Sequence, residues 1–312
     1  MIGCRPGGTY VDATVGLGGH AEAMAERIAP GGKLIGIDRD AEALRQTRGR
    51  LARFGKAVVL VQGNSDRLAA ALDEQGIDAV DGVLFDLGVS SLQLDDARRG
   101  FSYQRSGRLD MRMDPSTGPS ARELVNQAPL KELERVIRDY GEEPGWRRVA
   151  RAIVRTREQR EIVTTDELAG LIERAVTRAP RGRRVHGRET RLAARTFQAL
   201  RIAVNDELGA LERALPQALE RLRPGGRIVT LAYHSLEDRI VKETFRRWAR
   251  GCTCPPEFPV CRCGKRPAVR VLTKKPIAPD AAEVAANPRA RSARLRACEK
   301  LGPDEGGQET DR

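Results

Sequence analysis

The sequence predicts an α/β fold in which a doubly wound, mostly parallel sheet is interrupted by an all-helical insert. Three observations lead to this prediction. The first hundred residues alternate short β-branched runs with helical stretches, the middle of the chain has helical periodicity without a convincing strand, and strand patterns return near residue 227. We expect a split sheet domain at 1–101 and 195–300, a helical insert at 102–194, and a disordered tail at 301–312.

In the first third of the chain, short apolar runs alternate with helical stretches. The turn Pro30-Gly31-Gly32 leads into the second strand, and Asp40 is placed to cap the helix that follows. Such a regular order is typical of βαβ units, in which each helix crosses back over a parallel sheet. The expected strands are 9–15, 33–38, 57–61 and 83–87, joined by helices at 19–28, 40–53 and 66–75.

The middle of the chain is predicted to be helical. Apolar residues such as Leu130, Leu133 and Ile137 recur at three- and four-residue spacing, and Ser120 and Thr165 are suited to helix starts. We expect an exposed basic loop next, then a long helix, a fifth strand, a further helix and two last strands. These elements are expected at 178–188, 196–222, 227–233, 235–248, 269–272 and 295–297.

The composition is that of a globular, strongly basic protein. Hydrophobic residues make up 40% of the 312 residues, and no run of roughly eighteen apolar residues could span a membrane. The N-terminus lacks the apolar core of an export signal, so we expect a cytoplasmic protein without a membrane partner. The net charge is +12 and arginine predominates, which suits RNA because a guanidinium binds phosphate through two hydrogen bonds. A GC-rich genome that favours arginine codons would explain the same composition.

The segment Asp12-Ala-Thr-Val-Gly-Leu-Gly-Gly-His20 lies where the first strand ends and its helix begins. Glycine lets the backbone approach a ligand closely beside the positive end of a helix. Asp38 ends the second strand twenty residues after Gly18, where a carboxylate can accept hydrogen bonds from ribose hydroxyls. The pattern G-x-G-G differs from the G-x-G-x-x-G of dinucleotide sites, so it favours a nucleoside cofactor without phosphates. For the glycines alone, an ordinary tight turn is the alternative.

A second polar segment, Asp86-Leu-Gly-Val-Ser-Ser-Leu-Gln93, follows the fourth strand. It is expected at the edge where open α/β sheets bind their ligands. Its carboxylate and amide could hold the adenine amine and the amino-acid portion of such a cofactor. The alternative is a capped loop, because Asp and Ser both favour turns.

Four of the six cysteines form two C-x-C pairs, Cys252 with Cys254 and Cys261 with Cys263. Four thiolates could hold a structural zinc ion. However, C-x-C pairs are less diagnostic of zinc than C-x-x-C pairs. We therefore favour a loop without a metal and assign no metal ligands.

Several longer blocks, among them Arg195-Thr-Phe-Gln-Ala-Leu-Arg201 and Tyr233-His-Ser-Leu-Glu-Asp-Arg-Ile-Val-Lys242, resemble the ribosomal RNA small subunit methyltransferase H family. The resemblance implies N4-methylation of a decoding-region cytidine with S-adenosylmethionine as the methyl donor. It also implies a seven-stranded methyltransferase sheet in the split domain and an RNA- or substrate-recognition role for the insert. The other matching blocks are 12–20, 36–40, 85–95, 99–102, 109–114 and 286–292.

The resemblance also implies a set of cofactor contacts. One of them, usually Phe in the family, aligns with Ser65. The expected partner is small-subunit ribosomal RNA or the assembled small ribosomal subunit, and the oligomeric state stays open, a dimer included. The full set of implied contacts is Gly18, Gly19, His20, Asp38, Ser65, Asp86 and Gln93.

Two departures from the family pattern keep other functions open. Leu192-Ala-Ala stands where the family has His-Pro-Ala, and the chain begins almost at its first strand, which favours a missing N-terminal segment. One alternative is a non-catalytic RNA-binding ribosome assembly factor. Another is a methyltransferase that acts on a protein or a small molecule, which the basic insert disfavours.

Methyl transfer to an amine depends mainly on positioning, so the site needs few catalytic groups. Asp86 is the candidate that accepts a hydrogen bond from the cytosine amine. His234 is a second catalytic candidate, for which the structural alternative is a helix-start residue; Ser235 and Asp110 are further candidates for the base pocket. Arginines of the insert could clamp the RNA backbone, or they could form a solvated helix face. They are Arg147, Arg148, Arg151, Arg155, Arg157 and Arg160.

Overall fold

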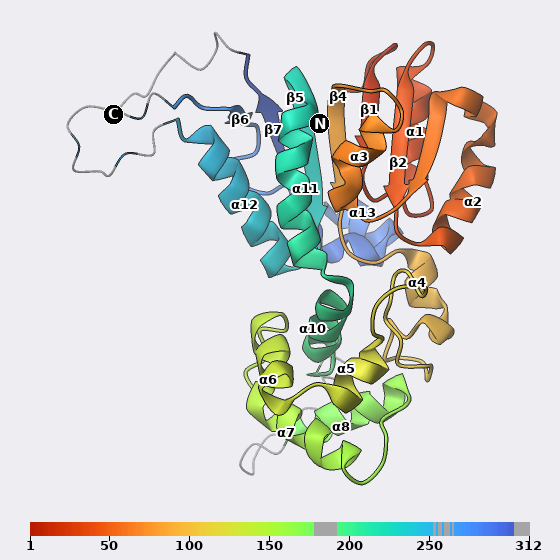
Figure 1. Cartoon of the computed structure of the whole chain (residues 1–312), viewed down its shortest axis with the longest axis vertical. Helices are drawn as coiled ribbons and strands as arrows, with labels where there is room; N and C mark the ends of the chain where they lie inside the picture. The colour runs from red at the N-terminus through yellow and green to blue at the C-terminus, as the bar shows by residue number, and fades with distance from the viewer. Residues whose placement is uncertain (178–191, 252–253, 255–257, 259–262, 264, 303–312) are drawn as a thin grey trace. The chain divides into compact units, whose positions relative to one another are not determined.

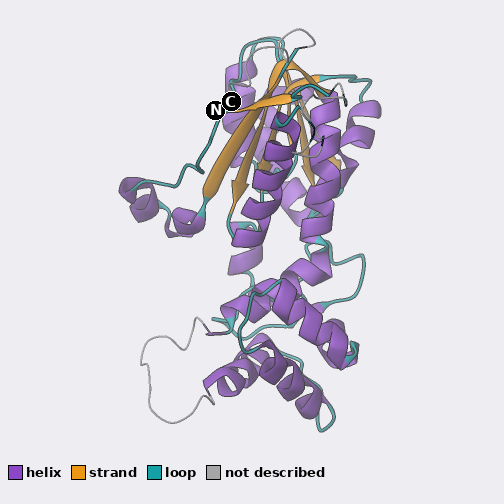
Figure 2. Ribbon diagram, turned by 90° about the vertical axis from the view of Figure 1, so that its left-hand side faces the viewer, coloured by secondary structure: helices purple, strands orange, loops and turns teal. Residues whose placement is uncertain are grey.

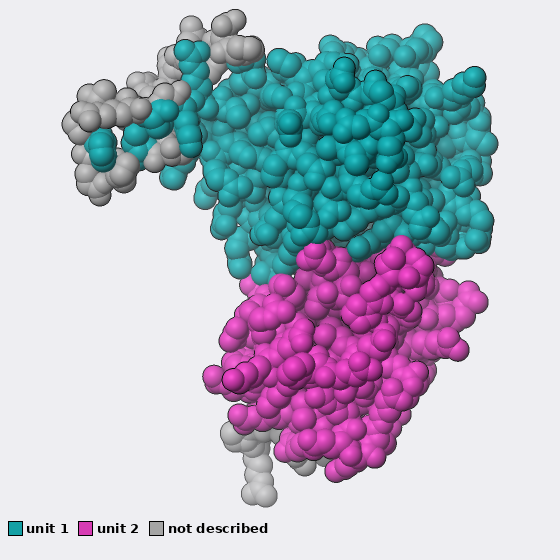
Figure 3. Space-filling model, viewed as in Figure 1, with its two compact units in different colours: residues 1–88, 208–312 teal, residues 89–207 magenta. Residues whose placement is uncertain are grey.

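The chain folds into two compact units. A computed structural model describes residues 1–177, 192–251, 254, 258, 263 and 265–302. Residues 1–88 and 208–312 form one unit, which we name the sheet unit, and residues 89–207 form the other, the helical unit (Figure 3). The sequence placed the domain boundaries near 101 and 195, whereas the units divide at 88 and 207.

The sheet unit contains a seven-stranded sheet of order β3-β2-β1-β4-β5-β7-β6. The first five strands in this order are parallel, and β7 pairs antiparallel with both β5 and β6. The predicted α/β sheet is therefore confirmed, with an antiparallel edge. The strands are β1 (Thr9–Asp12), β2 (Lys33–Asp38), β3 (Val58–Gln62), β4 (Val80–Asp86), β5 (Leu222–Ala232), β6 (Val269–Val271) and β7 (Arg294–Lys300).

Helices cover both faces of this sheet because successive strand residues point to opposite sides. Val11 packs in the core under α3, α11 and α12, whereas its neighbour Tyr10 packs in the core under α1 and α2. Figure 1 shows α3 and α11 in front of the strands. Because both faces are covered, the central strands are buried, and their sequences are nearly continuous apolar runs. These helices are α1 (Gly19–Ile28), α2 (Ala41–Leu51), α3 (Leu68–Asp73), α11 (Glu207–Arg221) and α12 (Ser235–Ala249).

The helical unit has its own apolar core, and its described residues form helices without a strand (Figure 2). The predicted start at Ser120 is confirmed, since Ser120 and Glu123 form a reciprocal capping box. Leu133 and Ile137 are fully buried one helical turn apart. The helices are α4 (Ser91–Asp95), α5 (Ala121–Gln127), α6 (Leu130–Asp139), α7 (Trp146–Arg157), α8 (Thr165–Thr177) and α10 (Ala194–Asn205).

The prediction of one long helix at 196–222 is wrong, because two helices occupy this range. Asp206 has a left-handed φ of 47°, which ends α10 at Asn205 before α11 begins at Glu207. Phe197 and Leu200 of α10 pack in the core of the helical unit, which is why this unit extends to residue 207.

Some expectations fall outside the described residues. They are the basic loop at 178–188, most of the tail after 301, and Cys252 and Cys261 of the cysteine pairs. No helix in the described part of the chain is long and apolar enough to cross a membrane.

Candidate functional site

Most of the predicted site residues follow the carboxyl ends of neighbouring parallel strands. β1 lies between β2 and β4, so Asp12 pairs in register with Gly36 on one side and Leu84 on the other. The loop after β1, the end of β2 and the end of β4 therefore share one edge of the sheet unit. Parallel α/β sheets bind their ligands at this edge.

Two adjacent glycines in the loop after β1 have different structural roles. Gly18 has a φ of 79°, and a Cβ there would lie 2.8 Å from Cγ2 of Thr47. Gly19 begins α1 with an ordinary φ, and a Cβ there would meet no atom within 4 Å. Gly18 is thus required by the backbone and the packing. Gly19 leaves open space at the N-terminus of a ten-residue helix.

Asp38 joins the end of β2 to the glycine loop. Its Oδ2 accepts the Gly16 N–H at 2.7 Å, and its Oδ1 accepts the Asp40 N–H at 2.9 Å. Burial raises the pKa of Asp38, and the two N–H donors oppose that rise. Each carboxylate oxygen retains a second lone pair, so Asp38 can still accept hydrogen bonds from a ligand.

Asp86, at the end of β4, is held by three neighbours. Its N–H donates to Oγ1 of Thr14 at 2.6 Å, and its Oδ1 accepts the Tyr233 hydroxyl at 2.9 Å. Its Oδ2 lies 3.4 Å from Nε2 of His20. The hydrogen bond between His20 and Asp86 is the largest cause of the raised pKa of His20. The pKa of Tyr233 is also raised, mainly by burial and then by the nearby Asp86. The carboxylate is therefore fixed in direction by a phenol that keeps its proton.

Asp12 is a functional candidate that the sequence reasoning missed. It is only 1% exposed, and burial raises its pKa to about 7, although the nearby His20 opposes the rise. A carboxyl group at the buried end of a central strand was the available signal. Tyr233 was also missed as a site residue. The pairing of Asp86 with Leu231 on the adjacent strand places Tyr233 near the end of β4.

The remaining predicted residues have contacts that give them structural roles. Ser65 is buried just after β3, where the Gly63 N–H donates to the Asp38 carbonyl at 2.9 Å. Gln93 lies in the helical unit, and its Oε1 accepts the Ser90 N–H at 3.1 Å in the capping box of α4. His234 is the N-cap of α12.

The contacts of His234 agree with the structural alternative, in which this residue starts a helix. Its Nδ1 accepts the Glu237 N–H at 3.4 Å, and its Nε2 lies 3.1 Å from a carboxylate oxygen of Glu237. Glu237 in turn accepts the Tyr233 N–H at 2.8 Å. This capping box fixes where the chain turns after β5, and thereby where Tyr233 lies.

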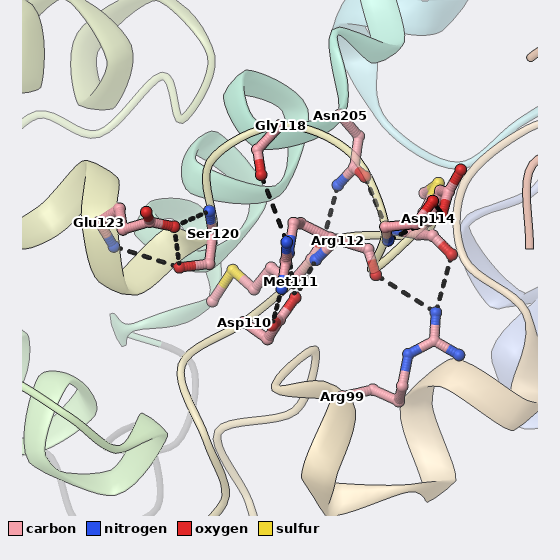
Figure 4. Close-up of polar contacts among 11 residues, drawn as sticks. Arg99, Asp110, Met111, Arg112, Asp114, Gly118, Ser120, Glu123 and Asn205 are labelled. Atoms are coloured by element: carbon pink, nitrogen blue, oxygen red, sulfur yellow. Dashed lines mark hydrogen bonds and ion pairs between the residues drawn. The ribbon is translucent and has the colours of Figure 1, made fainter.

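Asp110 lies in the helical unit, in a loop held by buried polar contacts (Figure 4). Asn205 accepts the Met113 N–H at 2.8 Å and donates to the Met111 carbonyl at 2.7 Å. Met111 has a φ of 60°, which is strained for a residue other than glycine. Arg112 pairs with Asp110 through its guanidinium. Burial would raise the pKa of Asp110, but hydrogen bonds from Arg112 outweigh it and lower that pKa.

Comparison with known proteins identifies the family of this chain. The model of the MraW methylase family matches residues 1–301. The chain belongs to this family. It is 56% identical to Ribosomal RNA small subunit methyltransferase H of Pelobacter propionicus over 298 residues, which are 95% of this chain and 94% of that protein. It is 54% identical to the protein of the same name from Symbiobacterium thermophilum over 300 residues, 96% and 93% of the two chains.

The resemblance predicted from the sequence is therefore confirmed. In this member of the family, Gly19 follows β1, which lies between the strands that end in Asp38 and Asp86, and a Cβ at Gly19 would meet open space. These groups offer hydrogen-bond acceptors and negative charge to a ligand.

Proposed function

We propose that this protein transfers a methyl group from S-adenosylmethionine to N4 of a cytidine in the decoding region of small-subunit ribosomal RNA. The observation that carries the proposal is the edge formed by Gly19, Asp38 and Asp86, in a chain matched along its length by methyltransferases of that RNA. We expect the reaction to take place in the cytoplasm, with free RNA or the assembled small subunit as the substrate.

The residues at this edge fit S-adenosylmethionine better than a phosphate-bearing cofactor. Two carboxylates, Asp38 and Asp86, lie at the ends of β2 and β4. Negative charge there attracts a sulfonium cation and repels a pyrophosphate. Asp38 can accept the ribose hydroxyls while holding the glycine loop, and the open space at Gly19 lets the ligand lie against the backbone. When bound, the cofactor supplies an activated methyl group.

Asp86 is proposed to position the amine that receives the methyl group. The cytosine amine is a poor nucleophile because its lone pair is delocalised into the ring. An acceptor that takes one of its N–H hydrogen bonds can turn the lone pair toward the methyl group. Asp86 suits this role because Tyr233 and Thr14 fix its carboxylate and backbone. No strong base is needed if the proton leaves after the methyl group arrives. The structural contacts of His234 make it a positioning residue in this scheme.

We further propose that α7 of the helical unit contacts the RNA backbone. Two of the six insert arginines have structural partners: Arg157 donates to the Val125 carbonyl at 2.8 Å, and Arg160 pairs with Glu167 at 2.6 Å. The other four are exposed and, among the described residues, form no ion pair. Arg147 lies over the Trp146 ring, with its guanidinium carbon 4.3 Å from the ring centroid. Guanidiniums without a carboxylate partner on one helix suit phosphate binding. They are Arg147, Arg148, Arg151 and Arg155.

The test is mass mapping of modified nucleosides after reaction with S-adenosylmethionine. Small-subunit RNA and assembled small subunits from cells that lack this protein are the two substrates, run in parallel. We expect one N4-methylated cytidine in at least one of them. Methylation of a protein alone, or S-adenosylmethionine binding without turnover on either substrate, would overturn the proposal. The second outcome would favour an assembly factor.

A further inference from the structure

The segment between β6 and β7, residues 272–293, lies at the same edge of the sheet unit as Asp86, together with Arg294, the first residue of β7. It contains α13 (Ala281–Ala286) and the short helix Pro288–Ser292. Reciprocal backbone hydrogen bonds between Ile277 and Leu295, at 3.0 and 2.9 Å, tie the segment to β7. The block 286–292 within it is one of the longer matching blocks, and the site described above uses none of its residues.

The local structure of this segment points its arginines outward. Asn287 accepts the Arg289 N–H at 3.2 Å and starts the short helix, with Pro288 as its first residue. Ala290 and Ala293 are each 6% exposed and anchor the turn against the sheet unit. The residues that follow them, Arg291 and Arg294, are exposed.

Sheet register places Arg294 close to the proposed methyl-transfer site. Arg294 pairs with Ala232 of β5, the residue before Tyr233, which donates to Asp86. Leu231 of β5 pairs with Asp86 on one side and with Leu295 on the other. Two strand spacings separate the Asp86 and Leu295 backbones, which is about 10 Å. A nucleotide held at Asp86 would thus have its neighbours within reach of Arg294.

The segment is positively charged, and its charges are available to a partner. Lys274, Lys275, Arg291 and Arg294 are all exposed, and in the described part of the chain none of them forms an ion pair. Arg296, two residues further along β7, is different: it is 6% exposed and binds both carboxylate oxygens of Asp238 at 2.6 and 3.0 Å. Arg296 therefore has a structural role. Arg294 donates one N–H to the Ala293 carbonyl at 2.9 Å and forms no ion pair among the described residues, so its other donors can still bind a phosphate, as can those of the exposed Arg291.

We propose that Arg291 and Arg294 bind the RNA phosphates that flank the target cytidine. The inference rests on the function proposed above. A base that leaves its stack to reach a methyl donor needs its backbone held on either side. Guanidiniums beside the acceptor edge can hold it through bidentate phosphate contacts.

The test compares two double variants that lose the same charge. R291A/R294A removes the proposed contacts. The control R27A/K56A removes two exposed cations at the opposite edge, one in the last turn of α1 and one just before β3. Affinity for small-subunit RNA is measured over a salt series, together with methylation kinetics and S-adenosylmethionine binding.

For R291A/R294A we expect the slope of log K against log salt to fall by about 1.4–1.8, because two phosphate contacts are lost. The KM for RNA should rise by about tenfold or more. The turnover rate at saturating RNA and the affinity for S-adenosylmethionine should not change, and the control should keep the wild-type slope. Equal slopes for R291A/R294A and wild type, or an equal loss in the control, would overturn the inference. If wild type itself methylates neither RNA nor subunits, the proposed function has failed, which is a separate result.

Discussion

Replacing each of the two adjacent glycines by alanine should separate a requirement of the fold from a requirement of the ligand. Gly18→Ala would hold alanine at a φ of 79°, a strain of about 1–2 kcal/mol. The new Cβ would also lie 2.8 Å from Cγ2 of Thr47, and overpacking of this kind costs about 1–3 kcal/mol. Together these effects predict a loss of about 2–5 kcal/mol in the free energy of unfolding.

A second substitution separates the two contributions. Thr47→Ser removes Cγ2 but keeps the hydroxyl that donates to the Gly16 carbonyl at 2.6 Å. The double variant G18A/T47S should therefore recover the packing part of the loss and retain the strain of about 1–2 kcal/mol.

Gly19→Ala is the matched control for stability. Its φ is ordinary and its Cβ would meet no atom within 4 Å, so the fold should keep its stability or gain slightly from the better helix former. The added methyl group would instead fill the space proposed for S-adenosylmethionine. We expect affinity to fall by about tenfold, which corresponds to about 1.4 kcal/mol.

Denaturant unfolding gives the stability of each variant, and titration calorimetry gives its affinity for S-adenosylmethionine. A G18A variant as stable as wild type would refute the reasoning about Gly18. A G19A variant that binds the cofactor as tightly as wild type would refute the placement of the ligand.

Three further predictions follow from the same contacts. Because Asp12 keeps its proton up to about pH 7 in the folded chain but only to about pH 4 when unfolded, wild-type stability should fall as pH rises through this window. Asp12→Asn should not show this part of the fall, so unfolding from pH 5 to pH 8 should favour the variant increasingly; a constant difference would contradict it. Tyr233→Phe should lower the turnover rate by about tenfold with cofactor affinity unchanged, since it removes only the hydrogen bond that orients Asp86; steady-state kinetics and calorimetry check this. Asn205→Ala should destabilise the chain by about 2–4 kcal/mol in denaturant unfolding, because it leaves a buried N–H and a buried carbonyl without this partner.

The first half of the sheet unit could be predicted from the sequence because its boundaries are marked by turn residues. The helix at Gly19–Ile28 and the strand at Lys33–Asp38 agree with the structure to the residue. The break at Asp206 could not be predicted, since Asp occurs in helices and nothing local shows a left-handed φ. The assignment of α10 to the helical unit depends on packing of Phe197, which periodicity alone does not reveal.

Part of the candidate site could likewise be predicted from the sequence, and part of it could not. Gly18 and Asp38 could be placed together because parallel topology brings the ends of adjacent strands to one edge. The contact between Asp86 and Tyr233 requires the register of β4 with β5, which sequence spacing does not supply. The high pKa of Asp12 depends on burial by the whole sheet unit. For Gln93, the sequence alternative of a capped loop describes the contacts that the structure shows.

The central claim is that the edge beside Gly19 and Asp38 binds S-adenosylmethionine, and titration calorimetry of the full chain tests it most directly. The account predicts a single saturable site in the wild-type protein. It also predicts that Asp38→Asn, which keeps the size of the side chain, weakens that site by about tenfold or more. Absence of binding heat from well-folded wild-type protein at several temperatures, or full affinity in the Asp38 variant, would contradict the claim.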